Sequence, residues 1–462
     1  MKWIRNLSRI NAQKFGIVLL LGCSLVLLAY FSTSEQFASP YSITVDFEVT
    51  STHMSSDALV GDNRTSEKLA VTAEPQEKLV CNLADWRSDV CEMHGDVRMD
   101  GISSSVLFVS SSEIGNSALN ETVIIRPYAR KADKILMAKI KEVFIKSLNN
   151  PAEAPTCTEN HSIPAVVFAL GGFTGNYWHD FTDVIVPLFI TSRQFNGEVQ
   201  FLIAAMRTWW VNKYGNILKQ LSHYKVIDFN KEDEVHCYSH ATIGLHSHKD
   251  FTIIPLRAPN NYSMVDFGKF LRTAYSLDRD SAINLVEDHV EKPRLMIIAR
   301  NRTRRLTNID QIVPMAMELG FDVMVEEASF FTQVAQYAQV VNSLDVMIGV
   351  HGAGLTNMVF LPTNAVVIEI VPFGNIERIA QNDFGNSAVD LKLKYLQYSI
   401  SEEESTLMDL YPRDHPVFKD PISIHKQGWT AMGRIYLVEQ NVKLNVTRFR
   451  PFLLKALELL RH

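Results

Sequence analysis

A short apolar run that ends in a glycine turn restricts the fold of this chain more than any other segment. The run Val346 to Val350 has the length and composition of a buried parallel strand. His351, Gly352, Ala353 and Gly354 follow it, and the next residues suit the start of a helix. Glycines allow a close backbone approach and a helix N-terminus favours an anion. The turn, with the imidazole of His351 as a further donor, therefore predicts a phosphate-binding site.

Arginine side chains cluster after a second strand-like run upstream. Arg300, Arg304 and Arg305 follow the run Arg294 to Ala299. Such a cluster can be an ordinary solvated loop, but guanidinium groups at a strand end are also suited to bidentate phosphate binding. Together with the glycine turn at the end of the other strand, the cluster predicts a site for the diphosphate of a nucleotide.

Two further residues are predicted to contact this nucleotide. Asn357 follows the glycine turn, and Glu369 lies near the end of the next apolar run, Ala365 to Val371. The carboxylate of Glu369 is placed either to bind the ribose hydroxyls or to cap the segment that follows. Both residues are therefore candidates for the donor site.

Strand-like runs alternate with helical stretches along two parts of the chain. The strand candidates are Ala165–Leu170, Val199–Ala204, Lys225–Asp228, His240–Leu245, Arg294–Arg300, Asp322–Glu326, Asp345–Val350 and Ala365–Val371. The helix candidates are Tyr177–Arg193, Trp209–Leu221, Ile309–Leu319, Phe330–Ser343 and Leu355–Leu361. This alternation indicates an α/β fold with parallel layers. We predict two Rossmann-like domains facing across a cleft, residues 80–270 and 271–446, and a C-terminal helix, 447–462, that packs back on the body.

The N-terminal residues predict a membrane anchor. Residues 15–31 form an uncharged apolar run, at the short end for a bilayer span, and the basic residues of this region precede it. The positive-inside rule leaves residues 1–14 in the cytosol and the rest in the lumen, and a short span suits an early secretory membrane. A cleaved signal peptide is the alternative, disfavoured by the run length and by the lack of a clear cleavage site. Residues 32–79 are polar and aperiodic and predict a flexible stem.

Glycosylation sequons and cysteines agree with a luminal body. The sequons predicted to carry glycans are Asn63, Asn120, Asn160, Asn261 and Asn445. Asn301 also begins a sequon, but a glycan there would block the arginine cluster, so we predict that it is unmodified. The cysteines of the body, Cys81, Cys91, Cys157 and Cys237, allow two disulfides in any of three pairings.

The segment Gly171 to Asp183 follows the first strand of the first predicted domain and is a candidate for catalysis. His179 and Asp183 are four residues apart, so on a helix they share a face and the carboxylate can orient the imidazole. Either residue is then a candidate general base that removes a proton from an acceptor hydroxyl. The alternative is a helix start in which His179 packs on Trp178 and the aspartates cap the helix.

Aromatic residues around this segment are candidates for binding an acceptor. The residues predicted to contact an acceptor are Asn176, Tyr177 and Trp178, and the aromatic rings of Tyr177 and Trp178 can stack on a ring of the ligand. Trp209 and Trp210 can serve the same purpose or belong to the core.

Together these segments resemble the plant branch of glycosyltransferase family sixty-one, the xylan-decorating enzymes. The resemblance covers Cys81 to the C-terminus and rests on segments that occur in order behind a type II anchor. These segments are Arg87–Arg98, Gly171–Asp183, Arg300–Asn308, Gly349–Asn357 and Thr447–Phe452. The resemblance implies a GT-B-like fold at the Golgi membrane, a UDP-pentose donor, a xylan hydroxyl as acceptor and inversion at the anomeric carbon. More distant relatives that add GlcNAc to proteins share Asn176-x-x-His179, which supports a catalytic role for His179.

No metal, cofactor or nucleic acid is expected as a partner. The one Asp-x-Asp pair, Asp278-Arg-Asp280, has no apolar strand before it, so we interpret it as a chance match to the metal-binding motif of other sugar transferases. The arginines and the helix dipole can neutralise a leaving diphosphate instead, which predicts a metal-independent reaction. A net charge of −6 without a basic stripe argues against nucleic-acid binding.

Several alternatives remain open at this point. The sequence does not decide whether the donor is UDP-arabinofuranose or UDP-xylose. Ring size and one hydroxymethyl group distinguish the two sugars, which is a small basis for discrimination by a binding pocket. The chain can also be an N-glycan core β-1,2-xylosyltransferase, or a non-catalytic Golgi lectin or assembly subunit, although such a subunit would tend to have lost the arginines, the glycines or the base. A soluble dehydrogenase is disfavoured because the turn lacks the full Gly-x-Gly-x-x-Gly run.

Overall fold

A computed structural model describes residues 77–110, 122–286, 291–327 and 333–461. The predicted cytosolic tail, the predicted membrane anchor (residues 15–31), nearly all of the predicted stem, and the sequons at Asn63 and Asn120 lie outside the described residues. Within the described ranges, no helix is both long and apolar enough to cross a membrane.

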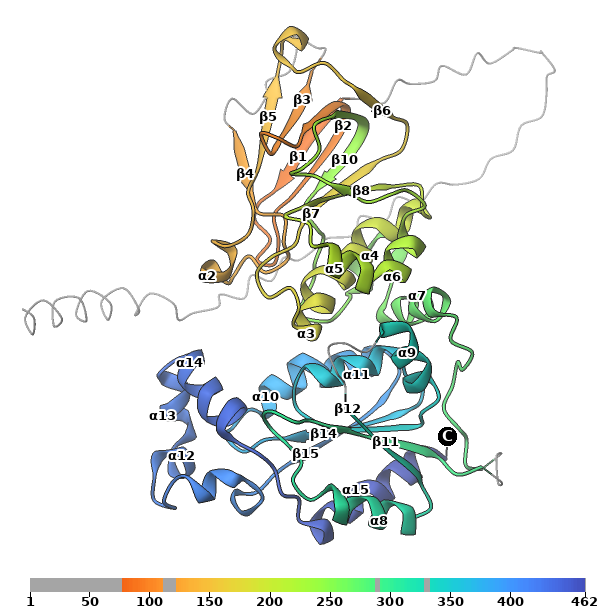
Figure 1. Cartoon of the computed structure of the whole chain (residues 1–462), viewed down its shortest axis with the longest axis vertical. Helices are drawn as coiled ribbons and strands as arrows, with labels where there is room; N and C mark the ends of the chain where they lie inside the picture. The colour runs from red at the N-terminus through yellow and green to blue at the C-terminus, as the bar shows by residue number, and fades with distance from the viewer. Residues whose placement is uncertain (1–76, 111–121, 287–290, 328–332, 462) are drawn as a thin grey trace, which may run out of the picture. The chain divides into compact units, whose positions relative to one another are not determined.

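The first part of the described chain builds a ten-stranded sheet (Figure 1). Its strands are β1 (Lys78–Asn82), β2 (Val90–Asp100), β3 (Ser105–Val109), β4 (Val123–Ile125), β5 (Val143–Leu148), β6 (Glu159–His161), β7 (Ala165–Ala169), β8 (Gln200–Ala204), β9 (Ile227–Asp228) and β10 (Val235–Ile243). The strand order is β4-β5-β3-β2-β10-β7-β8-β9, with β1 paired to β2 and β6 paired to β10. The helices of this part are α2 (Lys134–Met137), α3 (Tyr177–His179), α4 (Val186–Ser192), α5 (Thr208–Lys213) and α6 (Gly215–Leu221).

This first sheet is mixed, and only part of it was predicted. The four predicted strands are present as β7 to β10, and each pairs in parallel with its neighbour. The sheet continues through β2, which pairs antiparallel with β1, β3 and β10. The prediction of a purely parallel first domain is therefore wrong. Buried and partly exposed positions alternate along most of β2, so this strand lacks the continuous apolar run by which parallel strands are recognised.

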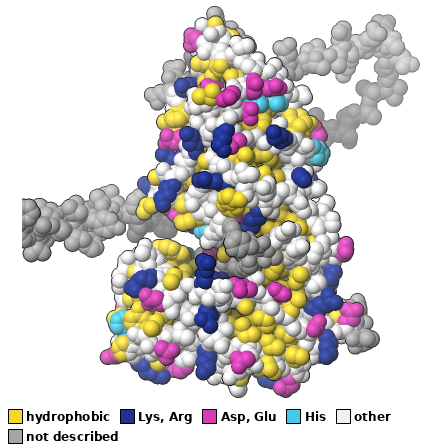
Figure 2. Space-filling model, viewed as in Figure 1, with side chains coloured by type: hydrophobic (Ala, Val, Ile, Leu, Met, Phe, Trp, Pro, Cys, Tyr) yellow, Lys and Arg dark blue, Asp and Glu magenta, His cyan; other side chains and the backbone are white. Residues whose placement is uncertain are grey.

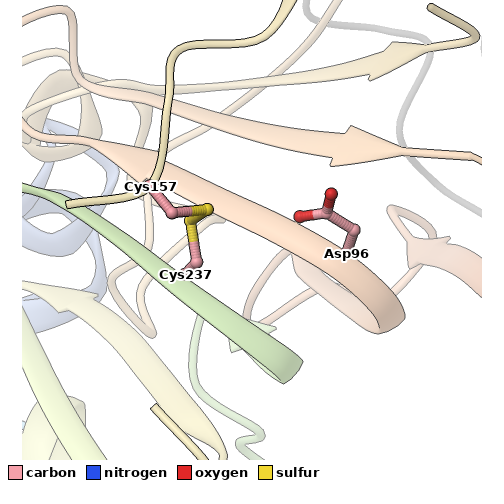
Figure 3. A group of neighbouring side chains, drawn as sticks. All are labelled: Asp96, Cys157 and Cys237. Carbon is pink, nitrogen blue, oxygen red and sulfur yellow. A yellow bond between two sulfur atoms is a disulfide. The ribbon is translucent and has the colours of Figure 1, made fainter. Parts of the chain in front are cut away.

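Two disulfides tie the first sheet together. Cys81 on β1 is bonded to Cys91 on β2, at a point where the two strands pair directly. Cys157 is bonded to Cys237 on β10, and Asp96 lies beside this second bridge (Figure 3). The four cysteines thus form two disulfides, as predicted, in one of the three arrangements that the sequence left open.

The second sheet is five-stranded and entirely parallel. Its strands are β11 (Arg294–Ala299), β12 (Asp322–Glu327), β13 (Val346–Val350), β14 (Val366–Val371) and β15 (Lys394–Ser399), in the order β12-β11-β13-β14-β15. Helices α8 (Ile309–Glu318) and α15 (Val446–Leu459) cover one face, and α9 (Val334–Asn342), α10 (Glu377–Ala380) and α11 (Asn386–Asp390) cover the other (Figure 1). The predicted parallel α/β layering is confirmed for this part. The strand order reverses between β11 and β13, which is where open α/β sheets bind ligands.

The two sheet regions share one hydrophobic core. Residues 72–462 form a single compact unit. The ring of Phe181 lies 6.4 Å from that of Phe267 and 6.3 Å from that of Phe360, so residues from both regions meet around it. Helix α7 (Met264–Tyr275) contacts α6 on one side and α9 and α11 on the other, and the predicted domain boundary at residue 270 falls inside this helix.

Irregular helical turns occur in both regions. A π-helical turn, η2 (Asp180–Ile185), lies between α3 and α4, and a second, η7 (Gln381–Gly385), lies between α10 and α11. The predicted helix after the glycine turn is a 3₁₀ helix, η6 (Ala353–Phe360). Because π turns inside α-helices are frequent at functional sites, the residues of η2 and η7 are candidates for the functional site.

The remaining helices complete the C-terminal part. They are α12 (Pro416–Lys419), α13 (Pro421–Lys426) and α14 (Trp429–Met432), which pack around a second cluster of buried residues that includes Leu407 and Tyr436. Helix α15 packs on α8, β14 and β15, so the C-terminal helix does return to the body.

Candidate active site

The two predicted anion-binding segments meet at the switch point of the second sheet. Arg300 directly follows β11 and His351 directly follows β13, and these strands are paired neighbours. Gly352 has φ 139°, and a Cβ placed there would lie 2.9 Å from Nη1 of Arg304 and 3.0 Å from Nη1 of Arg300. Glycine is required at this position by its backbone conformation and by the two guanidinium groups that close over it.

Arg300 and Arg304 have no acidic partner among the described residues. Nε of Arg300 donates to the carbonyl of Thr303 (2.9 Å), and Nη1 of Arg304 donates to the carbonyl of His351 (2.9 Å). Nε of Arg304 is buried without a partner in the described structure. Burial, with a contribution from neighbouring Arg300, lowers the pKa of Arg304 to about 9. Two adjacent, desolvated cations are costly unless an anion joins them, so this arrangement favours a phosphate ligand.

A cavity of about 270 Å³ opens beside these arginines, and we call it the donor cavity. Both sheet regions contribute to its wall. The residues that line it are Gly175, Tyr177, Lys213, Ile298, Ala299, Arg300, Asn301, Arg302, Thr303, Glu327, Val334, Tyr337, Ala353, Gly354 and Asn357. The predicted donor residues Arg300, Ala353, Gly354 and Asn357 are therefore together in one wall.

Arg305 does not close over Gly352 with Arg300 and Arg304, which corrects its prediction as a donor contact. The chain reverses at Arg304, which has φ 53°. The backbone N–H of Arg305 donates to the side chain of Asn441, its carbonyl accepts from Val442, and its side chain is exposed. The turn at Arg304 thus separates Arg305 from the two arginines that face Gly352.

Glu369 does not face the donor cavity either, so the prediction that it binds a ribose is wrong. Its carboxylate is fully buried on β14. Nδ1 of His351 lies 2.7 Å from Oε1 of Glu369, and the hydroxyl of Tyr395 donates to Oε2 (2.7 Å). The carboxylate therefore fixes the orientation of His351, which is itself only 4% exposed.

Glu327 is the acidic residue that does line the donor cavity, and sequence reasoning missed it. It ends β12, the strand next to β11, and its side chain is exposed. In nucleotide-binding α/β sheets, an acidic residue at the end of the second strand accepts hydrogen bonds from the ribose. The signal was available in the sequence, because Glu327 follows the predicted strand Asp322–Glu326 directly.

His179 and Asp183 form a buried dyad, held by arginines from distant parts of the chain. Nδ1 of His179 lies 2.9 Å from Oδ2 of Asp183, which also accepts from the hydroxyl of Tyr128 (3.0 Å). Nη1 of Arg130 lies 3.1 Å from Oδ1 and Nη2 of Arg87 lies 3.5 Å from it. A carboxylate in this setting accepts the Nδ1 proton of His179, so Nε2 is the nitrogen free to accept a proton. Asp183 is fully buried and His179 is 13% exposed, which favours His179 as the group that meets a ligand.

Asp250 completes the network behind the dyad. Its Oδ1 lies 2.6 Å from Nη1 of Arg87 and 3.5 Å from Nη1 of Arg130. Two arginines and two aspartates therefore balance in charge, which is the condition under which buried ions persist. None of Arg87, Arg130 and Asp250 was predicted, although Arg87 begins the first of the segments that carry the family resemblance.

Asp180 holds the turn Gly171–Gly175, which precedes α3, and therefore has a structural role. It accepts hydrogen bonds from the backbone N–H of Gly175 (2.9 Å), the indole of Trp210 (2.9 Å) and the hydroxyl of Tyr214 (2.8 Å). Burial raises the pKa of Asp180. Trp210 is fully buried and belongs to the core, whereas Trp209 is 42% exposed.

The three predicted acceptor contacts occupy different places. Asn176 caps α3 by accepting from the N–H of Trp178 (3.1 Å). Tyr177 lines the donor cavity. Trp178 is only 8% exposed and its indole donates to the carbonyl of Asp383 (3.2 Å), so this ring has little surface left for a sugar. The predicted acceptor role of Trp178 is therefore corrected to a packing role.

Asp383, on η7, stands between the dyad and the glycine turn, and nothing in the sequence indicated it. Its Oδ2 lies 3.9 Å from Nε2 of His351, and its carbonyl accepts from Trp178, the neighbour of His179. Burial raises the pKa of Asp383 to about 7, against a lowering by His351. A carboxyl group that titrates near neutral pH in a candidate site is a functional candidate in its own right.

This raised pKa has a consequence for stability that can be measured. Between pH 3.8 and about 7 the unfolded chain releases the proton that folded Asp383 retains, so the free energy of unfolding falls as the pH rises through this window. We expect Asp383→Asn to be more stable than the parent above pH 7, by about 1–3 kcal/mol, and equal to it below pH 4. Urea midpoints at pH 4, 6 and 8 test this. Asp278→Asn, at an exposed carboxylate, is the matched control, and an equal gain in both variants would contradict the prediction.

The described sequons and the acidic pairs are all at the surface. Asn160, Asn261 and Asn445 are exposed, as glycan attachment requires, and Asn301 lies in the wall of the donor cavity. Asp278 and Asp280 are exposed, and Asp280 pairs with Arg272. Among the described residues, the one cluster with metal-ligand spacing is Asp96, Cys157 and Cys237, whose sulfur atoms are bonded to each other (Figure 3). This cluster is therefore not available to an ion.

Charged side chains of both signs are interspersed over the molecular face in Figure 2. Lysine and arginine side chains also lie at the junction of the two sheet regions on this face (Figure 2). The sheets, the arginine-lined cavity and the dyad together define an α/β protein with a candidate anion-binding site and a candidate base.

Comparison with known proteins identifies the family to which the chain belongs. The Glycosyltransferase 61 family model matches residues 177–368, which include the dyad, the arginines and the glycine turn. An alpha-1,3-arabinosyltransferase of Oryza sativa subsp. japonica is 52% identical over 82% of this chain and 65% of its own length. A beta-1,2-xylosyltransferase of the same organism is 47% identical over 92% of this chain and 94% of its own length. A xylan glycosyltransferase of Arabidopsis thaliana is 35% identical over 86% of this chain and 83% of its own length. The chain belongs to glycosyltransferase family 61.

Proposed function

We propose that this chain transfers a pentose, arabinofuranose or xylose, from a UDP-sugar to a hydroxyl of the xylan backbone. The names of its relatives, which include arabinosyl-, xylosyl- and xylan glycosyltransferases, support this substrate class. One observation carries the proposal for the site. Arg300 and Arg304 lie together over Gly352 without an acidic partner in the described structure, and a nucleoside diphosphate supplies the missing negative charge.

The donor cavity suggests how the nucleotide lies. The diphosphate sits against Arg300, Arg304 and the glycine turn. Ile298, Val334 and Tyr337 provide an apolar wall for the base, and Glu327 is placed to accept hydrogen bonds from the ribose. Tyr177 and Lys213, from the first-sheet region, also line the cavity, and Tyr177 lies on α3 with His179.

The reaction proposed for this geometry is a single displacement. An acceptor hydroxyl oxygen attacks the anomeric carbon of the donor, and the bond from that carbon to the UDP oxygen breaks, which inverts the configuration. Nε2 of His179 takes the proton of the hydroxyl, while Asp183 stabilises the resulting imidazolium. UDP leaves with its negative charge facing Arg300 and Arg304, so the proposed reaction needs no metal.

We further propose a GT-B-like arrangement at the Golgi membrane. The first-sheet region provides the acceptor side and the second-sheet region the donor side. Residues 15–31 serve as a single-pass type II anchor with the body in the lumen. The exposed sequons at Asn160, Asn261 and Asn445 are in keeping with a luminal body.

Transfer assays with the purified chain test this proposal. A xylo-oligosaccharide is incubated with UDP-arabinofuranose or UDP-xylose, with and without EDTA, and the anomeric configuration of the product is determined by NMR. We expect transfer from one UDP-pentose, with inversion, that survives EDTA. Transfer only to an N-glycan core would favour the N-glycan xylosyltransferase. No transfer to any glycan by folded protein would favour a non-catalytic role, and loss of activity in EDTA would overturn the metal-independent mechanism.

Glu327 provides a separate test of the donor orientation. Glu327→Gln is expected to raise KM for the UDP-sugar about tenfold, with kcat nearly unchanged, because it weakens a hydrogen bond made in both the ground state and the transition state. Glu326→Gln is the matched control, since Glu326 is also exposed on β12 but does not line the donor cavity. Equal KM values for the two variants would remove Glu327 from the donor site.

A further inference from the structure

A second hollow lies beside the dyad and shares no lining residue with the donor cavity. It has a volume of about 610 Å³ and is lined by Trp86, Lys249, Asp250, Asn382, Asn386 and Asp390, among others. A smaller hollow of about 260 Å³ adjoins it, shares Trp86 and Asp250, and adds Arg87 and Arg130. We call the two together the Trp86 groove. It is larger than the donor cavity, so it has room for a ligand larger than a nucleotide.

The groove leads to the candidate base through a single layer of side chains. Asp250, in the wall shared by both hollows, is bonded to Arg87 and lies 3.5 Å from Arg130. Both arginines contact Asp183, and Asp183 orients His179. Only one layer of arginine side chains therefore separates a ligand in the groove from Asp183.

The helical turn η7 connects the groove with the donor side of the site. Asn382 lines the groove, and the next residue, Asp383, faces His351 on the glycine turn at 3.9 Å. Two consecutive residues of η7 therefore face the groove and the glycine turn, respectively. A sugar chain bound in the groove would therefore lie against the same helical turn that faces His351.

The lining of the groove suits a neutral sugar chain. Trp86 is 54% exposed, and the guanidinium of Arg87 lies 5.4 Å from its ring, which holds the indole in place. An exposed aromatic face packs against the C–H face of a sugar ring, while amides such as Asn382 and Asn386 both donate to and accept from hydroxyl groups. Lys249 and Asp390 carry opposite charges in the wall of the groove, in contrast to Arg300 and Arg304, which have no acidic partner in the described structure.

We propose that the Trp86 groove binds the acceptor, a neutral chain of β-linked pentoses, and that Trp86 provides its stacking platform. This inference rests on the proposed function for the identity of the glycan. It moves the acceptor site away from Asn176, which caps α3, Tyr177, which lines the donor cavity, and Trp178, which is packed. The new site is a surface formed by the segment after β1 and by η7 and α11.

Oligosaccharide binding and kinetics of the whole 462-residue chain test the groove. Isothermal titration with xylohexaose, mannohexaose and cellohexaose is carried out on the parent, Trp86→Ala, Asn382→Ala and the control Trp429→Ala. The control removes a tryptophan of α14 that is more exposed than Trp86 (66% against 54%). We expect xylohexaose to bind the parent and Trp429→Ala equally. Trp86→Ala and Asn382→Ala should weaken binding about five- to tenfold, with an equal rise in acceptor KM and unchanged UDP affinity.

The outcomes separate this inference from the proposed function. Pentosyl transfer that is equally efficient in Trp86→Ala and Trp429→Ala would overturn the groove and leave the function intact. Trp86-dependent binding of an oligosaccharide by a chain that transfers no pentose would support the groove and overturn the function. If none of the three oligosaccharides binds the parent, the groove is not a glycan site.

Discussion

Changing His179 to glutamine is expected to lower kcat for pentosyl transfer by about 10²- to 10⁴-fold, because the attacking hydroxyl then loses its proton acceptor. Glutamine keeps a polar group of similar length at this position, so the buried network around Asp183 should retain most of its contacts. The affinity for UDP, measured by titration, should stay unchanged, because His179 does not line the donor cavity. The expected signature is therefore a loss of turnover without a loss of donor binding.

His223→Gln is the matched control for this variant. His223 is 61% exposed and pairs with Glu198 at the surface of the first-sheet region. The His223→Gln variant should keep the kcat and the UDP affinity of the parent. If His179→Gln keeps parental kcat at saturating donor and acceptor, His179 is not the base and the packing interpretation of Trp178 and His179 is correct.

The donor half of the site could be predicted because it depends on local sequence and on one general property of parallel sheets. β11, β13 and β14 are mostly buried on both faces and appear as nearly continuous apolar runs, with Arg294 at the start of β11 and Glu369 inside β14 as the exceptions. The residues that follow such strands meet at one edge, so Arg300 and Gly352 could be placed together without a structure.

Arg305 and Glu369 were placed incorrectly in that half. Their surroundings depend on a local backbone turn and on the contacts of one strand, which the sequence pattern does not show. The backbone conformation of Arg304 turns Arg305 away from the cavity. Glu369 lies on β14, and the hydrogen bond from the N–H of His351 to the carbonyl of Ile370 sets the imidazole beside its carboxylate. From the sequence, the carboxylate of Glu369 could face either a ligand or the histidine turn. The register between β13 and β14 determines that it faces His351.

The dyad side of the site could be predicted only in part. The i,i+4 spacing identified His179 and Asp183, but their partners come from remote segments. Arg87 follows β1, Arg130 follows β4 and Asp250 follows β10, and the mixed sheet brings them together. No local pattern predicts such contacts, because antiparallel pairing of an alternating strand such as β2 leaves a weak sequence signal.

Changing Arg304 to methionine is expected to separate ligand binding from stability. Burial and Arg300 lower the pKa of Arg304 to about 9, so below pH 9 the folded protein carries the full cost of keeping this group charged. Methionine removes that charge and fills similar space, so the urea midpoint at pH 7 should stay the same or rise. A charged hydrogen bond to phosphate contributes about 1.5–3 kcal/mol, so the Kd for UDP should rise about 10- to 150-fold.

Arg305→Met removes the same charge one residue away and is the matched control. Because the side chain of Arg305 is exposed and, unlike that of Arg304, does not close over Gly352, the UDP affinity and the urea midpoint of Arg305→Met should both equal those of the parent. Arg300→Ala should weaken UDP binding in the same way as Arg304→Met, since both guanidinium groups lie over Gly352. A lower urea midpoint in Arg304→Met with parental UDP affinity would mean that the arginine supports the turn and does not bind the donor. An equal or higher urea midpoint together with weaker UDP binding would instead mean that Arg304 is kept for donor binding, and a higher midpoint would mean that it is kept at a cost to the stability of the folded protein.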